Sequence, residues 1–378
     1  MKKCTLIFLV LLTALFACKK DNDNNDVVDP PAAQLSVKWD HNYSYWLNMP
    51  DNLHNLVSTP DGGAAVFFSW FTDTESGSCL LKTNADGTTD FLHEFTAGEF
   101  GSGDASLIHT SDNGYLLYGS AATPVFGKTD AEGNVLWMKS MNYHQLQRVT
   151  SITEKPAGGF LALAEAYMGI YLVDLDASGD TIRTFLLMDS LQIADGQQVE
   201  YDKSGKIIVA FSGRINDDYR SFITAVDSNF NEIWSLQVAQ AGRGIVLNSF
   251  YINNDNSLLA AGSIFTNGTV DDVGYIAGVS ATGSLNWSKS LTDIHYTIMD
   301  VELAPTGGYY LVGDHDIMIT KINAAGDILW RESLEPTNQI GPSGNTLKIS
   351  GNDILFFGNN FDLSSLNQTP VLIKFTEQ

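Results

Sequence analysis

One pattern of apolar and polar positions recurs along the chain. It consists of an apolar stretch, a small-residue turn containing a glycine, and an aromatic residue four positions after that glycine. The pattern is clearest from Ile317 to Trp330, where Gly326 lies in the turn. The same spacing joins three further pairs: Gly133 and Trp137, Gly283 and Trp287, and Gly87 and Phe91. Such regular recurrence predicts an array of one supersecondary unit.

Each unit is predicted to hold four short strands. A first apolar alternation reaches a turn such as Asp61-Gly62-Gly63, and a second strand rich in β-formers follows at once, as in Ala64 to Phe68. A variable loop leads to the third strand. These third strands are predicted at Leu80 to Thr83, Val125 to Thr129, Tyr171 to Leu175, Phe222 to Val226, Tyr275 to Val279, Ile317 to Ile322 and Val371 to Phe375. The units begin about 44 to 52 residues apart, which suits the blades of a β-propeller.

The two ends of the chain are predicted to share the last blade. The seventh unit stops at Gln378, just after its third strand, whereas Leu35 to Trp39 resembles a fourth strand that has no preceding three. Pairing the two would close the ring without an exposed sheet edge. The sequence therefore predicts an all-β, seven-bladed propeller of four-stranded blades over residues 35–378, closed by the N-terminal strand.

The repeated tryptophan is expected to pack against the neighbouring blade and to bury a large apolar surface there. Two positions depart from the pattern: Phe230 replaces the glycine before Trp234, and Arg183 replaces the tryptophan after Gly179. The phrase Asp-Ala-x-Gly-x-x-x-Trp, seen at Asp130 to Trp137, resembles the tryptophan-docking repeat of quinoprotein-like propellers. This resemblance implies a scaffold role in an envelope assembly complex. The chain departs from that family in its shorter turn, in having seven units rather than eight, and in lacking a vicinal cysteine pair.

The N-terminus predicts export and lipidation. Lys2 and Lys3 precede an apolar run that is too short to span a membrane, and Leu15 to Cys18 resembles the lipobox of bacterial lipoproteins. Residues 1–17 are therefore expected to form a signal peptide, and Cys18 to carry the lipid. Residues 18–34 have the polar, acidic and proline-containing composition of a flexible tether. These features predict an outer-membrane lipoprotein on the cell surface, with a periplasmic location as the alternative.

Charge narrows the range of partners. The chain has 21 Lys and Arg against 44 Asp and Glu, a formal net charge of -23. A protein this acidic repels phosphate backbones, so nucleic acid is not an expected partner.

Candidate ligand-binding residues are predicted on the variable loops and at the mouth of the central channel. Loops held by a rigid scaffold often carry binding residues, and aromatic faces beside carboxylates and amides suit a sugar. The candidates are Trp46, Trp70, Tyr143, Tyr219, Tyr296, Asp104, Arg148 and Asp300. Asn248 and Gln198 are expected beside them near the channel mouth. The same loops could dock a protein, and their aromatic residues could equally serve only to cover blade ends.

The sequence contains no convincing catalytic or metal motif. Its seven histidines lack the spacing of metal ligands, and Asp314-His315-Asp316 fits a turn better than a metal site. Asp217-Asp218 and Asp271-Asp272 could hold Ca²⁺ if neighbouring carbonyls converged, but no cofactor is expected. The main hypothesis is a non-enzymatic propeller that binds a glycan or protein. A hydrolase or lyase that uses channel carboxylates from distant blades is a further alternative.

Overall fold

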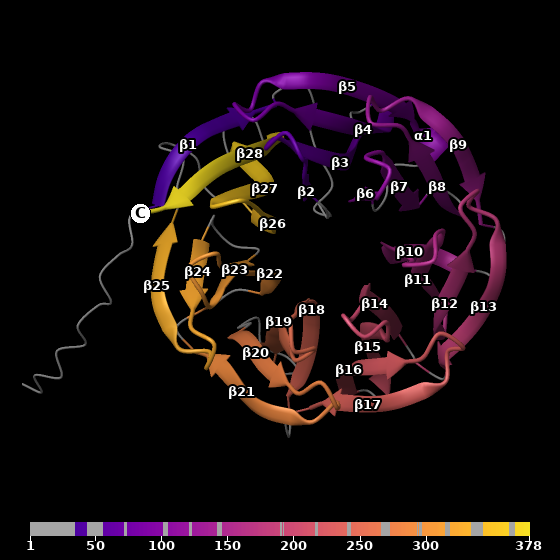
Figure 1. Cartoon of the computed structure of the whole chain (residues 1–378), viewed down its shortest axis with the longest axis vertical. Coiled ribbons are helices and arrows are strands. Elements are labelled where there is room, and N and C mark those ends of the chain that lie inside the picture. Colours follow the sequence, from indigo (N-terminus) through magenta and orange to yellow (C-terminus); the bar gives the residue numbers. More distant parts are fainter. Residues whose placement is uncertain are drawn as a thin grey trace, which may run out of the picture. The chain divides into compact units, whose positions relative to one another are not determined.

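The computed structural model describes residues 35–43, 56–71, 74–100, 105–120, 123–141, 146–189, 191, 193–215, 218–239, 243–265, 273–292, 294, 297–313, 318–333, 343–362 and 367–378. Their strands form seven antiparallel sheets of four strands arranged as a ring (Figure 1). The predicted seven-bladed propeller is therefore confirmed. The one helix among these residues is α1 (Ala97–Phe100), and none of them forms a helix long and apolar enough to cross a membrane.

Six blades are each built from four consecutive strands. Blade 1 holds β2 (Leu56–Ser58), β3 (Ala64–Phe71), β4 (Ser76–Thr83) and β5 (Thr89–Thr96). Blade 2 holds β6 (Ala105–His109), β7 (Tyr115–Ser120), β8 (Pro124–Thr129) and β9 (Val135–Ser140). Blade 3 holds β10 (Leu146–Glu154), β11 (Phe160–Ala166), β12 (Gly169–Leu175) and β13 (Thr181–Met188).

The second half of the ring repeats this order. Blade 4 holds β14 (Ile193–Tyr201), β15 (Ile207–Ile215), β16 (Asp218–Val226) and β17 (Glu232–Val238). Blade 5 holds β18 (Gly244–Ile252), β19 (Leu258–Phe265), β20 (Val273–Val279) and β21 (Leu285–Leu291). Blade 6 holds β22 (Ile298–Leu303), β23 (Tyr309–Gly313), β24 (Met318–Ile322) and β25 (Ile328–Ser333).

Blade 7 is shared between the two ends of the chain, as the sequence predicts. Its strands are β26 (Ser343–Ser350), β27 (Asp353–Asp362), β28 (Asn367–Glu377) and β1 (Leu35–Asn42). β1 pairs antiparallel with β28, from Leu35 opposite Glu377 to Asn42 opposite Val371. Figure 1 shows β1 and β28 side by side at the point where the ring closes. This pairing occupies the edge that β28 would otherwise expose.

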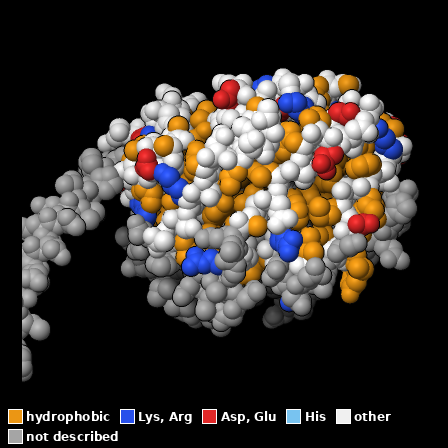
Figure 2. All heavy atoms as spheres, turned by 90° about the horizontal axis from the view of Figure 1, so that it is seen from below, with side chains coloured by type: hydrophobic (Ala, Val, Ile, Leu, Met, Phe, Trp, Pro, Cys, Tyr) orange, Lys and Arg blue, Asp and Glu red, His pale blue; other side chains and the backbone are white. Residues whose placement is uncertain are grey.

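The core is divided among the blade junctions. Each of the seven clusters of buried apolar side chains combines residues from two adjacent blades. The second and third strands are buried almost throughout, as in β15, where all residues from Ile207 to Gly213 are buried. Along the outer strands, more exposed and less exposed residues alternate. Ile233 of β17 and Leu285 of β21 are among the exposed apolar residues. Figure 2 shows this rim, where apolar side chains lie between scattered charged ones.

The repeated aromatic residue packs onto the next blade, which confirms the expectation from the sequence. A Cβ atom added to Gly179 would lie 2.5 Å from the Trp137 ring, and one added to Gly283 would lie 2.4 Å from Trp234. The contact continues across the closure, because the closing strand places Trp39 against Gly87 of blade 1. Glycine therefore serves two purposes in these turns: it adopts a positive φ, and it leaves space for an indole.

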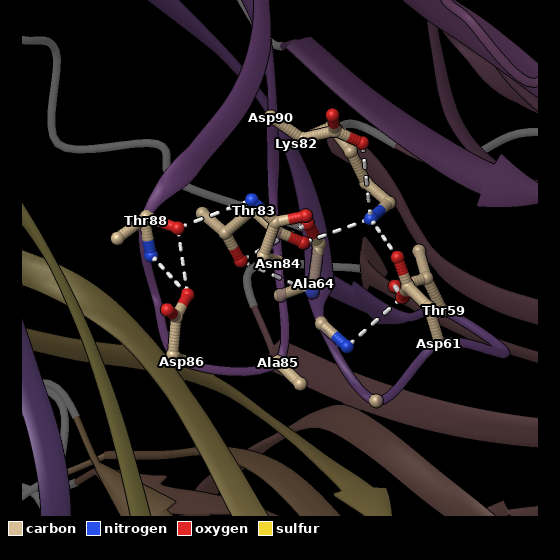
Figure 3. Close-up of polar contacts among 12 residues, drawn as sticks. Thr59, Asp61, Ala64, Lys82, Thr83, Asn84, Ala85, Asp86, Thr88 and Asp90 are labelled. Carbon is tan, nitrogen blue, oxygen red and sulfur yellow. Dashed lines mark hydrogen bonds and ion pairs between the residues drawn. The ribbon is translucent and has the colours of Figure 1, made fainter.

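A buried lysine holds the first turn of blade 1. Lys82 lies on β4 and is almost fully buried; its ammonium group donates to Asp61 Oδ2 at 2.6 Å and to the Thr83 carbonyl at 2.8 Å (Figure 3). Asp61 also accepts from Thr59 Oγ1 at 2.6 Å. These bonds and the adjacent ion pair lower the pKa of Asp61 to about 2, although burial alone would raise it. Lys128 and Asp112 repeat the arrangement in blade 2.

Candidate functional site

The innermost strands of all seven blades surround a cavity of about 710 Å³. Figure 1 shows β2, β6, β10, β14, β18, β22 and β26 facing the middle of the ring. Arg148, Gln198, Asn248 and Asp300, which the sequence places near the channel mouth, all line the cavity. A cavity of this size falls within the range of small-ligand sites.

Two rows of side chains run around the channel. Each row contains one residue from the inner strand of each blade. Within a row, these residues pair with equivalent positions on the second strands of their blades. The row that we call the upper ring is polar in each described blade and consists of Ser106, Ser151, Gln198, Ser249, Asp300 and Thr346. The row that we call the lower ring consists of Val57, Ile108, Thr153, Glu200, Tyr251, Glu302 and Lys348.

The upper ring joins neighbouring blades through hydrogen bonds. The amide of Val199 donates to Ser151 Oγ at 3.1 Å, which links blade 4 to blade 3. In the same way the amide of Phe250 donates to Gln198 Oε1 at 2.8 Å, which links blade 5 to blade 4. Asn248 adds a bond from its amide group to the Ile298 carbonyl at 2.8 Å. These polar side chains therefore satisfy backbone groups at the blade junctions.

Asp300 connects three blades. Its Oδ1 accepts from Ser249 of blade 5 at 2.8 Å and from the Val301 amide at 2.9 Å. Its Oδ2 accepts from Thr346 Oγ1 at 2.9 Å and from the Leu347 amide at 3.0 Å, both in blade 7. Asp300 is 8% exposed. Its carboxylate thus has a structural role beside the ligand-binding role that the sequence predicts.

Arg148 belongs to a charged group at one end of the channel. Its guanidinium donates to Glu165 at 2.6 and 3.1 Å and to Asp195 Oδ1 at 2.7 Å. Glu165 is only 4% exposed and also accepts from the Gly196 amide. Burial raises the pKa of Glu165 to about 7, although Arg148 opposes this rise. Blades 3 and 4 are therefore joined by a carboxyl group that titrates near neutral pH.

Lys348 forms a second charged group on the lower ring. It is ion-paired with Glu302 and lies 3.5 Å from Asp300 Oδ2. Burial raises the pKa of Glu302 to about 7 and also raises that of Glu200. Burial alone would lower the pKa of Lys348, but the surrounding carboxylates raise it above its ordinary value. One ammonium group is thus shared among several carboxylates.

The two described aromatic candidates pack within blade junctions. Trp70, at the end of β3, packs against a core cluster that contains Phe68 and Phe357 of blades 1 and 7. Its buried Nε1 has no hydrogen-bond partner among the described residues. Tyr219 makes an edge contact with Phe265 of the next blade, with ring centroids 5.3 Å apart. Their roles in ligand binding remain predictions.

The other candidates cannot be placed. Cys18, Trp46, Asp104, Tyr143 and Tyr296 lie outside the described residues. So do Asp217, Asp271-Asp272 and Asp314 to Asp316, on which the calcium and metal hypotheses rest. Within the described ranges, no group of three or more His, Cys, Asp or Glu is arranged to hold a metal ion.

Sequence reasoning missed Glu165, Glu200, Glu302 and Lys348. Glu200 and Glu302 lie two positions after Gln198 and Asp300, on the same face of each inner strand. That spacing could have revealed them once the first strands were aligned. The alignment is obscured because inner strands contain register shifts, such as those between Gly196 and Gln198 and between Ile298 and Asp300.

No family model and no curated protein matches the chain. Solved structures with a similar fold include the polysaccharide lyase Uly1, with a TM-score of 0.62 and 11% identity over 90% of this chain and 99% of that chain. The β-propeller domain of Cps50 (Swd1) from Myceliophteria thermophila has a TM-score of 0.57 and 10% identity over 89% and 100%. BBS1N, solved in complex with ARL6DN, has a TM-score of 0.56 and 9% identity over 92% and 98%. At these identities the similarities establish the propeller fold alone.

Proposed function

We propose that the protein is a non-enzymatic binding propeller whose central channel and adjoining loops hold a glycan. The observation that carries this proposal is the cavity of about 710 Å³ lined by hydroxyl, amide and carboxylate groups from all seven inner strands. Groups of these types bond sugar hydroxyls, and the half-buried Ile108 offers an apolar surface for C–H groups. A protein ligand that inserts a polar loop is the alternative occupant.

A glycan array probed with the purified protein tests this proposal. We expect specific hits that are lost in Thr153→Trp, because Thr153 lines the cavity and a bulky indole at this position would fill it. Thr181→Trp is the matched control, since Thr181 is exposed on the outer strand of the same blade. An array without hits, or hits that the Thr153→Trp variant still gives, would contradict glycan binding in the channel.

A lyase is the second candidate, and a specific observation favours it. Glu165 beside Arg148, and Glu302 beside Lys348, each combine a carboxyl group of raised pKa with a cation. Such a pair could remove a proton next to a sugar carboxylate while the cation neutralises that carboxylate. The structural similarity to Uly1, a polysaccharide lyase, is in keeping with this candidate.

The negative charge of the channel makes lyase activity a weaker candidate than glycan binding. Among the described residues, Arg148 and Lys348 are the two lysine or arginine side chains on the cavity wall, and both already contact carboxylates. An acidic polysaccharide would therefore meet a negative channel. Incubation with uronate-containing polysaccharides should yield no ultraviolet-absorbing unsaturated product. If such a product appears, and is lost in Glu165→Gln or Glu302→Gln, the lyase replaces the binding proposal.

We further propose that the propeller is held at the outer membrane by acyl chains on Cys18 and faces the cell surface. Support comes from the signal-peptide and lipobox pattern of residues 1–18. Labelling with a radioactive fatty acid should mark the wild-type protein and not Cys18→Ala. Protease treatment of intact cells should remove the propeller if it faces outward; full protection would place it in the periplasm.

A further inference from the structure

The upper ring is incomplete at one blade junction. Five of its members, from Ser151 through to Thr346, make the inter-blade hydrogen bonds described above. Ser106, the member from blade 2, lines the cavity and is 3% exposed, yet its Oγ has no hydrogen-bond partner among the described residues. A buried hydroxyl without a partner carries a desolvation cost that a ligand group can remove.

The strand that faces Ser106 differs from the other inner strands. β10 of blade 3 contains two register shifts, one between Leu146 and Arg148 and one between Val149 and Ser151. The other described inner strands with a shift contain one each. The shift between Val149 and Ser151 has counterparts in β14, β18, β22 and β26, so the shift between Leu146 and Arg148 is the one that sets β10 apart. At the junction of blades 2 and 3, Ser106 Oγ makes no hydrogen bond among the described residues like the one that Ser151 accepts from the Val199 amide.

The lower ring carries negative charge that its own cation does not match. Lys348 is ion-paired with Glu302 and lies near Asp300, as described above. Glu200 lines the same cavity, and the hydrogen bond to its carboxylate comes from a neutral group, the side-chain amide of Gln198, at 2.9 Å. Glu200 is half-buried and makes no direct ion pair among the described residues, while Lys348 is already paired with Glu302. Such a carboxylate favours a positively charged ligand group.

Building on the proposed glycan binding, we propose that the channel recognises an amino sugar with a free amine. Its ammonium group pairs with Glu200, and one of its hydroxyls bonds Ser106 Oγ across blade 3. Ile108, two residues after Ser106 on the same strand, offers the apolar contact for the sugar ring. This ligand class supplies a cation for the lower ring and a hydrogen-bond partner for the upper ring.

Calorimetry with two probes tests the proposal: a glucosamine tetrasaccharide and the same tetrasaccharide with every amine acetylated. Acetylation removes the positive charge and keeps the ring hydroxyls. We expect the free-amine form to bind at least about tenfold more tightly, a difference of about 1.4 kcal/mol. Glu200→Gln should abolish this preference, whereas Ser106→Ala should weaken both probes a few-fold.

Glu232→Gln is the matched control, because Glu232 is exposed on the outer strand of the same blade and loses the same charge. It should bind as the wild type does. Equal affinity of the wild type for the two probes would overturn the amine proposal and leave glycan binding intact, as would a preference that survives Glu200→Gln. Failure of both probes and of the array would overturn both. If Glu200→Gln does not fold, the comparison of the two probes on the wild type still decides.

Discussion

The outer contacts and the channel are built in opposite ways from the same repeat. On the outside, each blade places one side chain against the next blade, and five of these contacts pair an aromatic ring with a glycine turn. In the channel, the lower ring changes from Val57 to Thr153 to Glu200 from blade to blade. Residues that repeat from blade to blade thus hold the blades together, whereas residues that vary from blade to blade line the channel, where a ligand can enter.

Asp300→Ala is expected to have the largest effect, since Asp300 is a channel residue that also joins blades. The change leaves donors from three blades without their acceptor and should lower the free energy of unfolding by about 3 kcal/mol. Chemical denaturation measures it. Asp86→Ala removes a carboxylate from an exposed outer turn, where it accepts from Thr88, and should destabilise the protein much less. Equal losses would show that Asp300 does not connect the blades.

Gly179→Ala tests the outer contacts. Gly179 has a φ of 79°, and its added Cβ would lie 2.5 Å from the Trp137 ring. We expect a loss of about 2 to 3 kcal/mol, from backbone strain and displaced packing together. Gly205→Ala separates the two causes, because Gly205 has a φ of 84° and nothing within 4 Å of the added atom. It should lose only about 1 kcal/mol. Similar losses in both variants would mean that the indole contact contributes little.

The pH dependence of stability distinguishes the channel from the outer ring. The folded state raises the pKa of Glu302 from 4.5 to about 7, so it binds this proton more tightly than the unfolded chain does. The contribution of Glu302 is therefore fully present below pH 4.5 and is lost as the pH rises from 4.5 to about 7. Glu302→Gln should remove this loss, so its melting temperature should improve relative to wild type by an amount that grows through this window.

Glu232→Gln serves as the control for the pH experiment. Glu232 is exposed on the rim, and its replacement removes the same charge as the replacement of Glu302. A difference between Glu302→Gln and wild type that stays constant with pH would mean that Glu302 keeps an ordinary pKa in the folded protein. The effect should reach about 1 to 2 kcal/mol at neutral pH, less than the two effects above.

The sequence predicts the outer architecture well because one physical requirement repeats there. Each blade needs two turns and one aromatic residue to cover its neighbour, so periodicity reveals the blade number and the role of Trp39 in closure. The channel follows no such period. The sequence could place Asp300 and Gln198 near the channel. The ion pairs could not be predicted, because Lys348 lies 46 residues from Glu302, and Arg148 lies 17 residues from Glu165 and 47 from Asp195. Register shifts on these strands hide which side chains share a level.

Arg183 and Phe230 show what the sequence alone leaves unconnected. Each departs from the repeat at a different position, and the structure brings them into one contact: the Arg183 guanidinium lies 4.1 Å from the centre of the Phe230 ring. Arg183 takes the place of the docking indole, and Phe230, with a φ of 68°, takes the place of the glycine. Arg183 also donates to Asp174 at 3.0 Å and to the Ser228 carbonyl at 2.6 Å.

A double-mutant cycle on this pair should give the smallest effect. Arg183→Ala and Phe230→Leu should show a coupling of about 0.5 to 1 kcal/mol, typical of a cation over an aromatic ring at a partly exposed site. A swap sharpens the comparison with the regular junctions. Arg183→Trp alone should destabilise, because its indole would meet Phe230. Adding Phe230→Gly should recover stability by recreating the pair that Trp137 and Gly179 form. If the two changes simply add, Arg183 and Phe230 are independent substitutions, and the junction between blades 3 and 4 is held by its apolar core instead.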